Sequence, residues 1–354
     1  MRGLLLLLPA TQALGDEAAA CSIPPALNLS SGHSMPAIGL GTWKADAGLV
    51  GAAVRAALKL GYRLIDCAAV YGNEQEVGEA LAEMVGPGDD QIAREQVFVT
   101  TKVWNSEHRK EHLRPAVESS LRDLRLDYLD LVLIHWPQAF EHLPGTHFGL
   151  PTHPNGTMRF DWHVPLLETY QALEACVGIG LTRSIGVSNF ASSQLAEVLA
   201  HAVVPPAVLQ IESHPFFANG RLIEFARARG LAVTAYSPLG SGGVNHDGYS
   251  VVGHPALAEI GVALGNRSAA QVAVAWQLNR GLAVIPKSTS AARIASNLDV
   301  FFDLPPEALA QLEALDEKRR FIWAGPLVER GGAMRPRDED HPLFPFKMDD
   351  PEAF

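Results

Sequence analysis

The chain has 354 residues, of which 47% are hydrophobic and 19% are charged, a balance typical of a globular enzyme. Its formal net charge of -11 disfavours a nucleic-acid partner, because a phosphate-binding surface needs clustered basic residues. Beyond the N-terminal segment, no stretch reaches the roughly 18 uninterrupted apolar residues that a membrane-spanning helix needs. We therefore expect no nucleic-acid partner and no membrane span; a monomer is the default expectation.

The first segment, residues 1–23, is predicted to be an extension outside the folded domain. Arg2 and the leucine run Leu4–Leu8 resemble a secretory signal, and Ala18–Ala20 is a candidate cleavage region. Pro9 interrupts the apolar run, so a tolerated extension or an early start codon is the alternative. We expect a cytoplasmic protein, or a secreted or organellar one if this segment acts as a signal.

Along residues 24–354, short apolar runs alternate with amphipathic helical stretches. A segment around Ser31-Gly32 predicts a hairpin ahead of the first strand. The strands, in chain order, are predicted at Ile38–Leu40, Arg63–Asp66, Val97–Lys102, Leu129–His135, Arg183–Val187, Val208–Glu212, Ala232–Ser237 and Ala283–Lys287. The predicted helices between them include Glu74–Met84, Glu111–Leu124, Leu166–Gly180, Gln194–Ala200, Leu222–Arg229 and Ala269–Asn279. Asn73 and Ser192 are predicted helix caps, and Gly180 and Gly230 mark predicted helix ends.

Eight strand–helix units imply a parallel sheet with right-handed crossovers. Closing eight such units predicts a single α/β domain, a (β/α)8 TIM barrel, whose N-terminal end the hairpin would plug. Active sites of such barrels lie at the carboxyl ends of the strands. Polar groups stand at nearly all of these ends: Asp66, Lys102, His135, Ser188-Asn189, Gln210 with Glu212, Tyr236-Ser237 and Lys287-Ser288. Packing alone rarely produces that pattern, so we expect an active site there.

Asp66, Tyr71, Lys102 and His135 form the set with the clearest chemistry. A tyrosine is a poor acid near pH 7, because its ordinary pKa is about 10. A lysine ammonium within hydrogen-bond reach lowers that pKa, and an aspartate keeps the lysine charged and oriented. A histidine beside the tyrosine can hydrogen-bond a substrate carbonyl oxygen. Together they predict protonation of an oxygen while a hydride reaches carbon, although each residue alone has a structural alternative.

A Rossmann-type cofactor site is disfavoured, because no G-x-G-x-x-G loop follows a strand and opens a helix. Barrels instead bind phosphate around the loops after strands 7 and 8. Lys287 and Arg293 there can neutralise a ribose 2′-phosphate, which favours NADPH/NADP+ over NADH; a solvated helix start is the alternative. Tyr236 can stack on a nicotinamide ring or serve as a core aromatic.

We predict no metal site. The cysteines are too few for a disulfide framework and lack metal-ligand spacing: Cys21, Cys67 and Cys176. His108 and His112 are four residues apart without an H-E-x-x-H pattern, so a surface position is expected for both. Exposure is also expected for the histidines in the loop after the fourth strand: His142, His147, His153 and His163.

Several blocks of the sequence resemble signatures of the aldo-keto reductase family. The most specific is residues 61–74, Gly-Tyr-Arg-Leu-Ile-Asp-Cys-Ala-Ala-Val-Tyr-Gly-Asn-Glu. Further blocks follow in family order, at Met35-Pro36, Gly39–Trp43, Leu133–Pro137, Ile185–Phe190, Ala235–Ser241 and Ile285–Ser288. The resemblance extends from about Leu27 to the C-terminus, and the tail, residues 335–346, is similar to that of the family's aldehyde reductase branch.

The resemblance implies roles for individual residues. Tyr71 would be the general acid, tuned by Lys102 and Asp66, while His135 would orient the carbonyl group. NADPH/NADP+ would be held by Thr42, Trp43, Asp66, Ser188, Asn189, Gln210, Tyr236, Ser237, Leu239, Ser241, Lys287, Ser288, Ser290, Arg293 and Asn297. The substrate would contact Trp43, Tyr71, His135, Trp136 and Arg337. The C-terminal tail would fold over the barrel as a substrate loop, where Arg337 would favour aldehydes that carry a carboxylate, such as uronic acids.

Two departures from the family pattern bear on these roles. Ser296 stands where relatives often carry Glu or Gln near the adenine, which would weaken cofactor binding. The loop at residues 139–164 differs in length and sequence, which leaves substrate preference open. The predicted function is NADPH-dependent reduction of aldehydes to primary alcohols. The alternatives are a ketone- or sugar-specific reductase, a non-catalytic NADPH-binding regulatory subunit, and a structural barrel analogous to lens crystallins.

Overall fold

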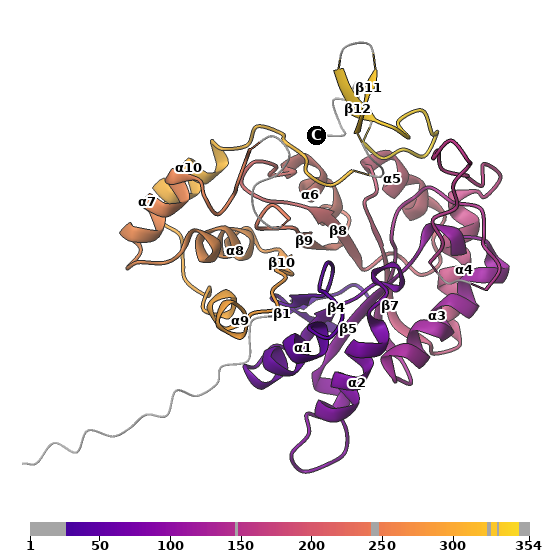
Figure 1. Ribbon diagram of the computed structural model, residues 1–354, viewed down its shortest axis with the longest axis horizontal. Helices are drawn as coiled ribbons and strands as arrows, with labels where there is room; N and C mark the ends of the chain where they lie inside the picture. The colour runs from indigo at the N-terminus through magenta and orange to yellow at the C-terminus, as the bar shows by residue number, and fades with distance from the viewer. Residues whose placement is uncertain (1–25, 146–147, 242–247, 324–326, 331–332, 347–354) are drawn as a thin grey trace, which may run out of the picture.

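A computed structural model describes residues 26–145, 148–241, 248–323, 327–330 and 333–346 (Figure 1). The predicted N-terminal extension with its candidate signal lies outside the described residues, as do Cys21 and His147. Among the described residues, none of the helices is both long enough and apolar enough to cross a lipid bilayer.

The eight predicted strands form one parallel sheet in which each strand pairs with the next along the chain. The strands are β3 (Leu40–Gly41), β4 (Leu64–Asp66), β5 (Phe98–Val103), β6 (Leu129–Ile134), β7 (Thr182–Ser188), β8 (Val208–Glu212), β9 (Ala232–Tyr236) and β10 (Ala283–Val284). Hydrogen bonds between the segment that leads into β3 and the last strand, β10, close the barrel: Gly39 N–H donates to Val284 O at 2.9 Å, and Val284 N–H donates to Ala37 O at 2.8 Å. β10 is shorter than predicted because Pro286 has no N–H to extend the ladder.

Alternate side chains of the strands enter two different cores, as the two-residue period of a strand requires. Leu131 and Leu133 of β6 belong to the cluster inside the barrel, whereas Val132 and Ile134 pack outward with the helices. The predicted hairpin is present as β1 (Ala26–Asn28) and β2 (Ser34–Pro36). Its Leu29 and Met35 are buried in the inner cluster, so the hairpin plugs the barrel as expected.

Helices surround the strands in the end-on view of Figure 1. In chain order they are α1 (Val50–Lys59), α2 (Glu74–Met84), α3 (Lys110–Leu124), α4 (Leu166–Gly178), α5 (Ser192–His201), α6 (Gly220–Arg227), α7 (Pro255–Ala263), α8 (Ala269–Asn279), α9 (Ala291–Leu298) and α10 (Pro306–Glu313). Short 3-10 turns, η1 (Ala69–Tyr71), η2 (Arg94–Gln96) and η3 (Asn105–Glu107), lie in the loops.

The predicted helix ends are confirmed at Gly180 and Gly230, which take positive φ angles of 78° and 81° just beyond α4 and α6. The predicted caps are wrong in detail. Asn73 precedes α2, but its side-chain amide donates to Thr42 O at 3.0 Å instead of capping the helix. Ser192 is the first residue of α5, and the capping position belongs to Ala191.

The C-terminal tail contributes a second hairpin, β11 (Leu327–Arg330) and β12 (Ala333–Pro336), which projects beyond the ring of helices near α5 (Figure 1). Beyond it, Phe344 and Phe346 pack with Trp136, just past the carboxyl end of β6. The tail therefore lies over the end of the barrel that the strand ends predict for the active site.

Candidate active site

Asp66 and Lys102 form a buried ion pair across adjacent strands β4 and β5. Lys102 Nζ lies 2.6 Å from Asp66 Oδ1, and both side chains are almost fully inaccessible to solvent. Lys102 Nζ also donates to Cys67 O at 2.8 Å, and Gln210 Nε2 donates to Asp66 Oδ2 at 2.8 Å. Both carboxylate oxygens are thus engaged, which fixes the ammonium group in place.

Tyr71 brings its phenol to this pair from η1, the turn after β4. Lys102 Nζ donates to Tyr71 Oη at 3.3 Å, so the predicted contact is present. Gly72 follows with a φ angle of 67°, a conformation that glycine adopts without strain and that ends the turn directly after the tyrosine. Unlike Asp66 and Lys102, Tyr71 is only partly buried, so the hydroxyl lies at the edge of the cluster.

The pKa of the Tyr71 phenol differs from the expectation that lysine would lower it. Burial raises the pKa to about 12, and the opposing effect of the Lys102 charge is smaller. Burial alone would lower the pKa of Lys102, yet Asp66 and Tyr71 raise it above its ordinary value. The lysine therefore stays charged near neutral pH, and the phenol keeps its proton. This state suits a proton donor.

His135 lies beside the tyrosine at the end of β6. The two rings meet edge to face with centroids 5.8 Å apart. Burial, with a further contribution from the Lys102 charge, holds the pKa of His135 well below its ordinary range. The imidazole is therefore neutral, and among the described residues its Nδ1 atom has no hydrogen-bond partner. A neutral imidazole can donate one hydrogen bond to a carbonyl oxygen without competing to be the acid.

Aromatic side chains flank the tyrosine and the histidine. Trp43 lies 6.3 Å from Tyr71 between ring centroids and is 36% exposed. Trp104 meets His135 edge to face at 5.3 Å, a contact that the sequence analysis missed although Trp104 directly follows β5. Trp136 is only 7% exposed because the tail residue Phe346 packs against it, with centroids 5.8 Å apart.

The residues predicted to hold a nicotinamide come together at the ends of β7, β8 and β9. Tyr236 Oη donates to Asn189 Oδ1 at 2.6 Å, and Asn189 Nδ2 donates to His135 O at 2.9 Å. Asn189 Nδ2 also contacts Ser188 Oγ at 3.1 Å. Since Gln210 bonds Asp66, this amide-rich group is continuous with the Asp66–Lys102 pair. On the other side, Thr42 Oγ1 donates to Asp66 O at 2.9 Å.

The residues predicted to hold phosphate surround the start of α9. Ser288 Oγ accepts from Ser290 N–H at 3.1 Å and from Arg293 Nε at 3.3 Å, while Lys287 and Arg293 are exposed. Asn297 is buried in the same helix, whose first turn, fully described, contains no acidic residue. After β9, Ser237 and Ser241 take φ angles of 50° and 57°. Leu239, between them, is partly buried.

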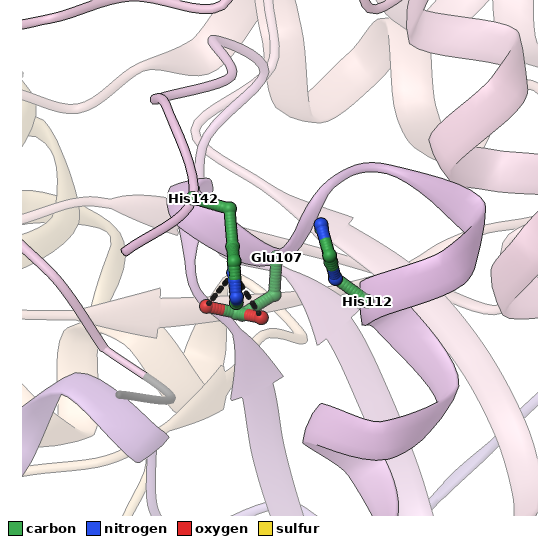
Figure 2. A group of neighbouring side chains, drawn as sticks. All are labelled: Glu107, His112 and His142. Carbon is green, nitrogen blue, oxygen red and sulfur yellow. Dashed lines mark hydrogen bonds and ion pairs between the residues drawn. The ribbon is translucent and has the colours of Figure 1, made fainter. Parts of the chain in front are cut away.

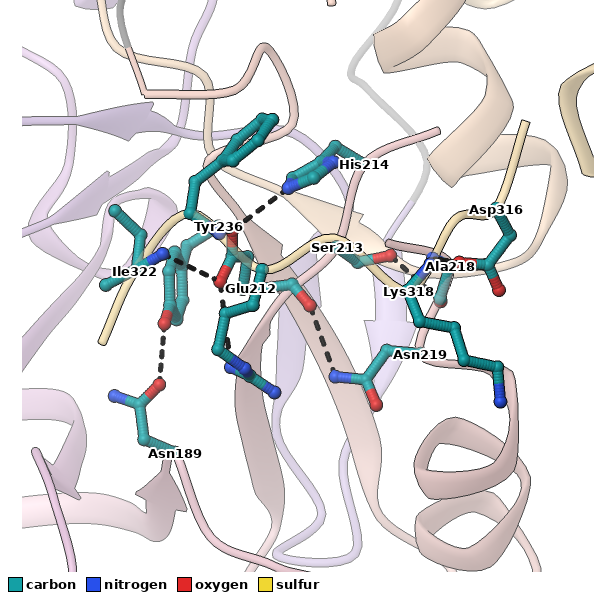
Figure 3. A network of polar contacts seen from close by, with 12 residues as sticks. Asn189, Glu212, Ser213, His214, Ala218, Asn219, Tyr236, Asp316, Lys318 and Ile322 are labelled. Atoms are coloured by element: carbon teal, nitrogen blue, oxygen red, sulfur yellow. Dashed lines mark hydrogen bonds and ion pairs between the residues drawn. The ribbon is translucent and has the colours of Figure 1, made fainter. Parts of the chain in front are cut away.

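A second buried carboxylate, Glu212 at the end of β8, attaches the tail (Figure 3). It accepts from the backbone N–H groups of Phe321 at 2.7 Å and Ile322 at 3.1 Å, and from His214 Nε2 at 2.9 Å. Arg320 Nη1 lies 3.6 Å away. From its sequence position, Glu212 is predicted only to end a strand, because the partner segment lies about 110 residues further along the chain.

Arg337 is not arranged as expected for a substrate carboxylate. Its guanidinium forms a bidentate ion pair with Asp338, at 2.6 and 2.7 Å, and also donates to Gly156 O at 3.1 Å. In this arrangement the charge of Arg337 is already neutralised by a neighbouring acid. The contact with Gly156 instead joins the tail to the loop between β6 and α4.

The predicted surface position of His108 is wrong. Its side chain is 2% exposed, and burial lowers its pKa to about 3. His112 is half-buried, as is His142, whereas His153 and His163 are exposed as expected. Sequence spacing did not reveal these burials because η3 and the start of α3 lie beneath the long loop after β6. Of the cysteines, the structure describes Cys67 and Cys176, which are buried free thiols.

Known proteins provide an independent comparison with this geometry. Residues 37–317 match the model of the aldo/keto reductase family. Proteins named aldo-keto reductase family 1 member A1 from Sus scrofa and Homo sapiens are 48% and 47% identical over 324 residues, covering 90% of this chain and 97% of each protein. The structure of the aldose reductase from Schistosoma japonicum superposes with a TM-score of 0.81 at 39% identity, covering 92% of this chain and all of that chain. The chain belongs to the aldo/keto reductase family.

Proposed function

We propose that the protein reduces aldehydes to primary alcohols with NADPH, and that Tyr71 donates the proton to the carbonyl oxygen. The observation that supports this most directly is the 3.3 Å contact between Tyr71 Oη and Lys102 Nζ, beside a lysine that a buried carboxylate keeps charged. The family match and the relatives named member A1 support carbonyl reduction in general.

The side chains at the barrel end fit a phosphorylated dinucleotide. Ser288 and Ser290 stand at the start of α9, where backbone N–H groups and the helix dipole favour an anion. Lys287 and Arg293 supply positive charge nearby. Tyr236, Asn189 and Gln210 offer a flat ring and amide groups for a nicotinamide. When bound, the reduced nicotinamide supplies the hydride that the carbonyl carbon accepts.

The protein's own groups would control the oxygen side of the reaction. Neutral His135 would direct a hydrogen bond at the carbonyl oxygen and hold it toward Tyr71. The phenol O–H bond breaks as the new O–H bond of the alcohol forms, and the Lys102 ammonium stabilises the phenolate that remains. Trp43, Trp104 and Trp136 surround this position with apolar surface and would limit the access of water.

Replacement of Tyr71 with phenylalanine tests the proposal. Tyr71→Phe should lower kcat for NADPH-dependent reduction of glyceraldehyde, glucuronate and a nitrobenzaldehyde by about 10²- to 10⁴-fold. NADPH affinity, measured by fluorescence titration, should persist. Tyr128→Phe is the matched control, because the Tyr128 hydroxyl has no hydrogen-bond partner among the described residues and precedes β6 at the opposite end of the barrel. Wild-type turnover in Tyr71→Phe would exclude the assigned role.

The NADPH preference has its own test. Arg293→Met should raise the KM for NADPH while leaving that for NADH nearly unchanged, because only NADPH carries the 2′-phosphate that the guanidinium would neutralise. An equal effect on the KM for NADPH and for NADH would show that Arg293 does not contact the 2′-phosphate.

The alternative of a regulatory subunit that only senses NADPH makes a different prediction. Such a protein would oxidise its bound NADPH in a single turnover but would show no steady-state turnover of aldehyde.

A further inference from the structure

Three side chains with metal-binding chemistry meet beside the active site, although they come from separate segments (Figure 2). Glu107 ends η3, His112 lies in the first turns of α3, and His142 belongs to the loop between β6 and α4. Each offers one ligand atom, and these atoms all lie within 4.8 Å of one another. The proposed reductase chemistry uses none of the three.

Glu107 is unusual for a carboxylate because it is almost fully buried, with only 1% of its surface exposed. It accepts from Ser106 Oγ at 2.8 Å, and His142 Nδ1 lies 3.2 and 3.3 Å from its two oxygens. Among the ion pairs of the described residues, none joins Glu107 to a lysine or an arginine. A buried carboxylate is stable when a cation or several donors compensate its charge, so this site favours a cation.

The imidazoles of His112 and His142 lie face to face beside the carboxylate. Their rings are stacked with centroids 3.8 Å apart and an interplanar angle of 11° (Figure 2). Four-coordinate zinc with nitrogen ligands at about 2.0–2.1 Å places its ligand atoms roughly 3.4 Å apart. Small rotations of His112 and His142 out of the parallel stack would direct one nitrogen of each toward a shared point in front of the carboxylate.

We propose that Glu107, His112 and His142 bind a divalent transition metal ion of the zinc type, with water as the remaining ligand. Two imidazole nitrogens and one carboxylate match the ligands that zinc prefers, whereas calcium and magnesium prefer oxygen ligands alone. The ion would lie between His142 Nδ1 and the Glu107 carboxylate and replace their direct contact. Spacing along the sequence excluded a metal only because the third ligand comes from a distant loop.

Binding there would stabilise one wall of the substrate position. Trp104, three residues before Glu107, donates from Nε1 to Gly149 O at 2.8 Å, and its ring contacts His135. The ion would fasten the loop carrying His142 and Gly149 to the start of α3. Because it touches none of the reacting groups, its effect should fall on the KM for the aldehyde more than on kcat.

Metal titration tests the site without relying on reductase activity. Protein treated with a chelator and then dialysed should bind one equivalent of ZnCl2 by calorimetry, and its melting temperature should rise with zinc. Co²⁺ bound in place of zinc should give visible absorption bands typical of a low-symmetry coordination site. His142→Ala and His112→Asn should abolish the high-affinity equivalent, the melting shift and the cobalt bands. His153→Ala, which removes an exposed histidine of the same loop, should leave all three unchanged.

The outcomes separate this proposal from the proposed function. Zinc binding that survives in both His142→Ala and His112→Asn, or a wild-type protein that binds no equivalent, would overturn the site. His112 and His142 are both half-buried, so these substitutions test the site without altering the buried Glu107. Loss of turnover in Tyr71→Phe together with unchanged zinc binding would separate the two sites.

Discussion

Two strands of the barrel end in a buried carboxylate, and the two carboxylates serve different purposes. Asp66, at the end of β4, bonds the terminal nitrogen atoms of two buried side chains, Lys102 Nζ and Gln210 Nε2. Glu212, at the end of β8, bonds the backbone of the C-terminal tail at Phe321 and Ile322. A buried carboxylate at a strand end therefore needs bonding partners, and the kind of partner indicates its role. Side-chain partners indicate a part in catalysis, whereas backbone partners indicate that the carboxylate holds a chain segment in place.

The largest effect is expected when the Asp66 cluster loses its cation. Lys102→Met leaves a buried carboxylate without its counter-ion, which should lower the free energy of unfolding by about 3–5 kcal/mol. It also removes the charge that stabilises the Tyr71 phenolate, so kcat/KM should fall by about 10²-fold or more. Urea unfolding and steady-state kinetics measure the two losses. Lys59→Met, at an exposed site of α1, is the control. Normal turnover in Lys102→Met would show that the Asp66–Lys102 pair is structural, like Glu212, and has no part in catalysis.

A smaller and different effect is expected at the second carboxylate. Glu212→Gln keeps the shape but weakens charge-assisted bonds to two tail amides, which should cost about 1.5–3 kcal/mol of stability. The KM for the aldehyde should rise as the tail loosens over Trp136, while kcat changes little. Proteolysis of the tail and steady-state kinetics measure this. Glu118→Gln, in an exposed pair with Arg114, should have almost no effect. A collapse of kcat in Glu212→Gln would mean that both carboxylates support chemistry.

The smallest expected change is in the pH profile of reduction. Tyr71 has a pKa near 12 and so keeps the proton it donates, and His135 stays neutral because its pKa is well below its ordinary range. The kcat/KM for aldehyde reduction should therefore be nearly flat from pH 6 to pH 8. Alcohol oxidation needs the phenolate and should rise with pH, by up to about tenfold per unit. A steep loss of reduction centred near pH 7 would show that a different group is the acid.

The sequence allowed the barrel, its plug and most of the site to be predicted, because periodicity and strand ends are local properties of a chain. Asp66, Lys102, His135 and Gln210 all follow from the polar ends of apolar runs. Trp104 also directly follows a strand, but an aromatic residue at that position is easily assigned to the core.

Other features depend on segments that are distant in sequence. The partners of Glu212 lie in the tail, and the burial of His108 depends on the loop after β6. The side chain of Asn73 bonds Thr42 O because the pairing of β3 with β4 brings the ends of these two strands together. The pKa of Tyr71 depends on how deeply the phenol is buried, and the spacing of residues along the sequence does not predict that burial.

The closure of the barrel between β3 and β10 also has a dynamic consequence. The junction is formed by two separate pairings, Ile38 with Val284 and Gly41 with Lys287, whereas β5 pairs with β6 over the continuous run Thr100–Val103. A dinucleotide bound as proposed would touch Thr42 on one side of the junction and Ser288 on the other. Cofactor saturation should therefore slow amide hydrogen exchange at Gly39, Gly41 and Val284 more than in β6, and the ligand would stabilise a short strand junction within its own binding site.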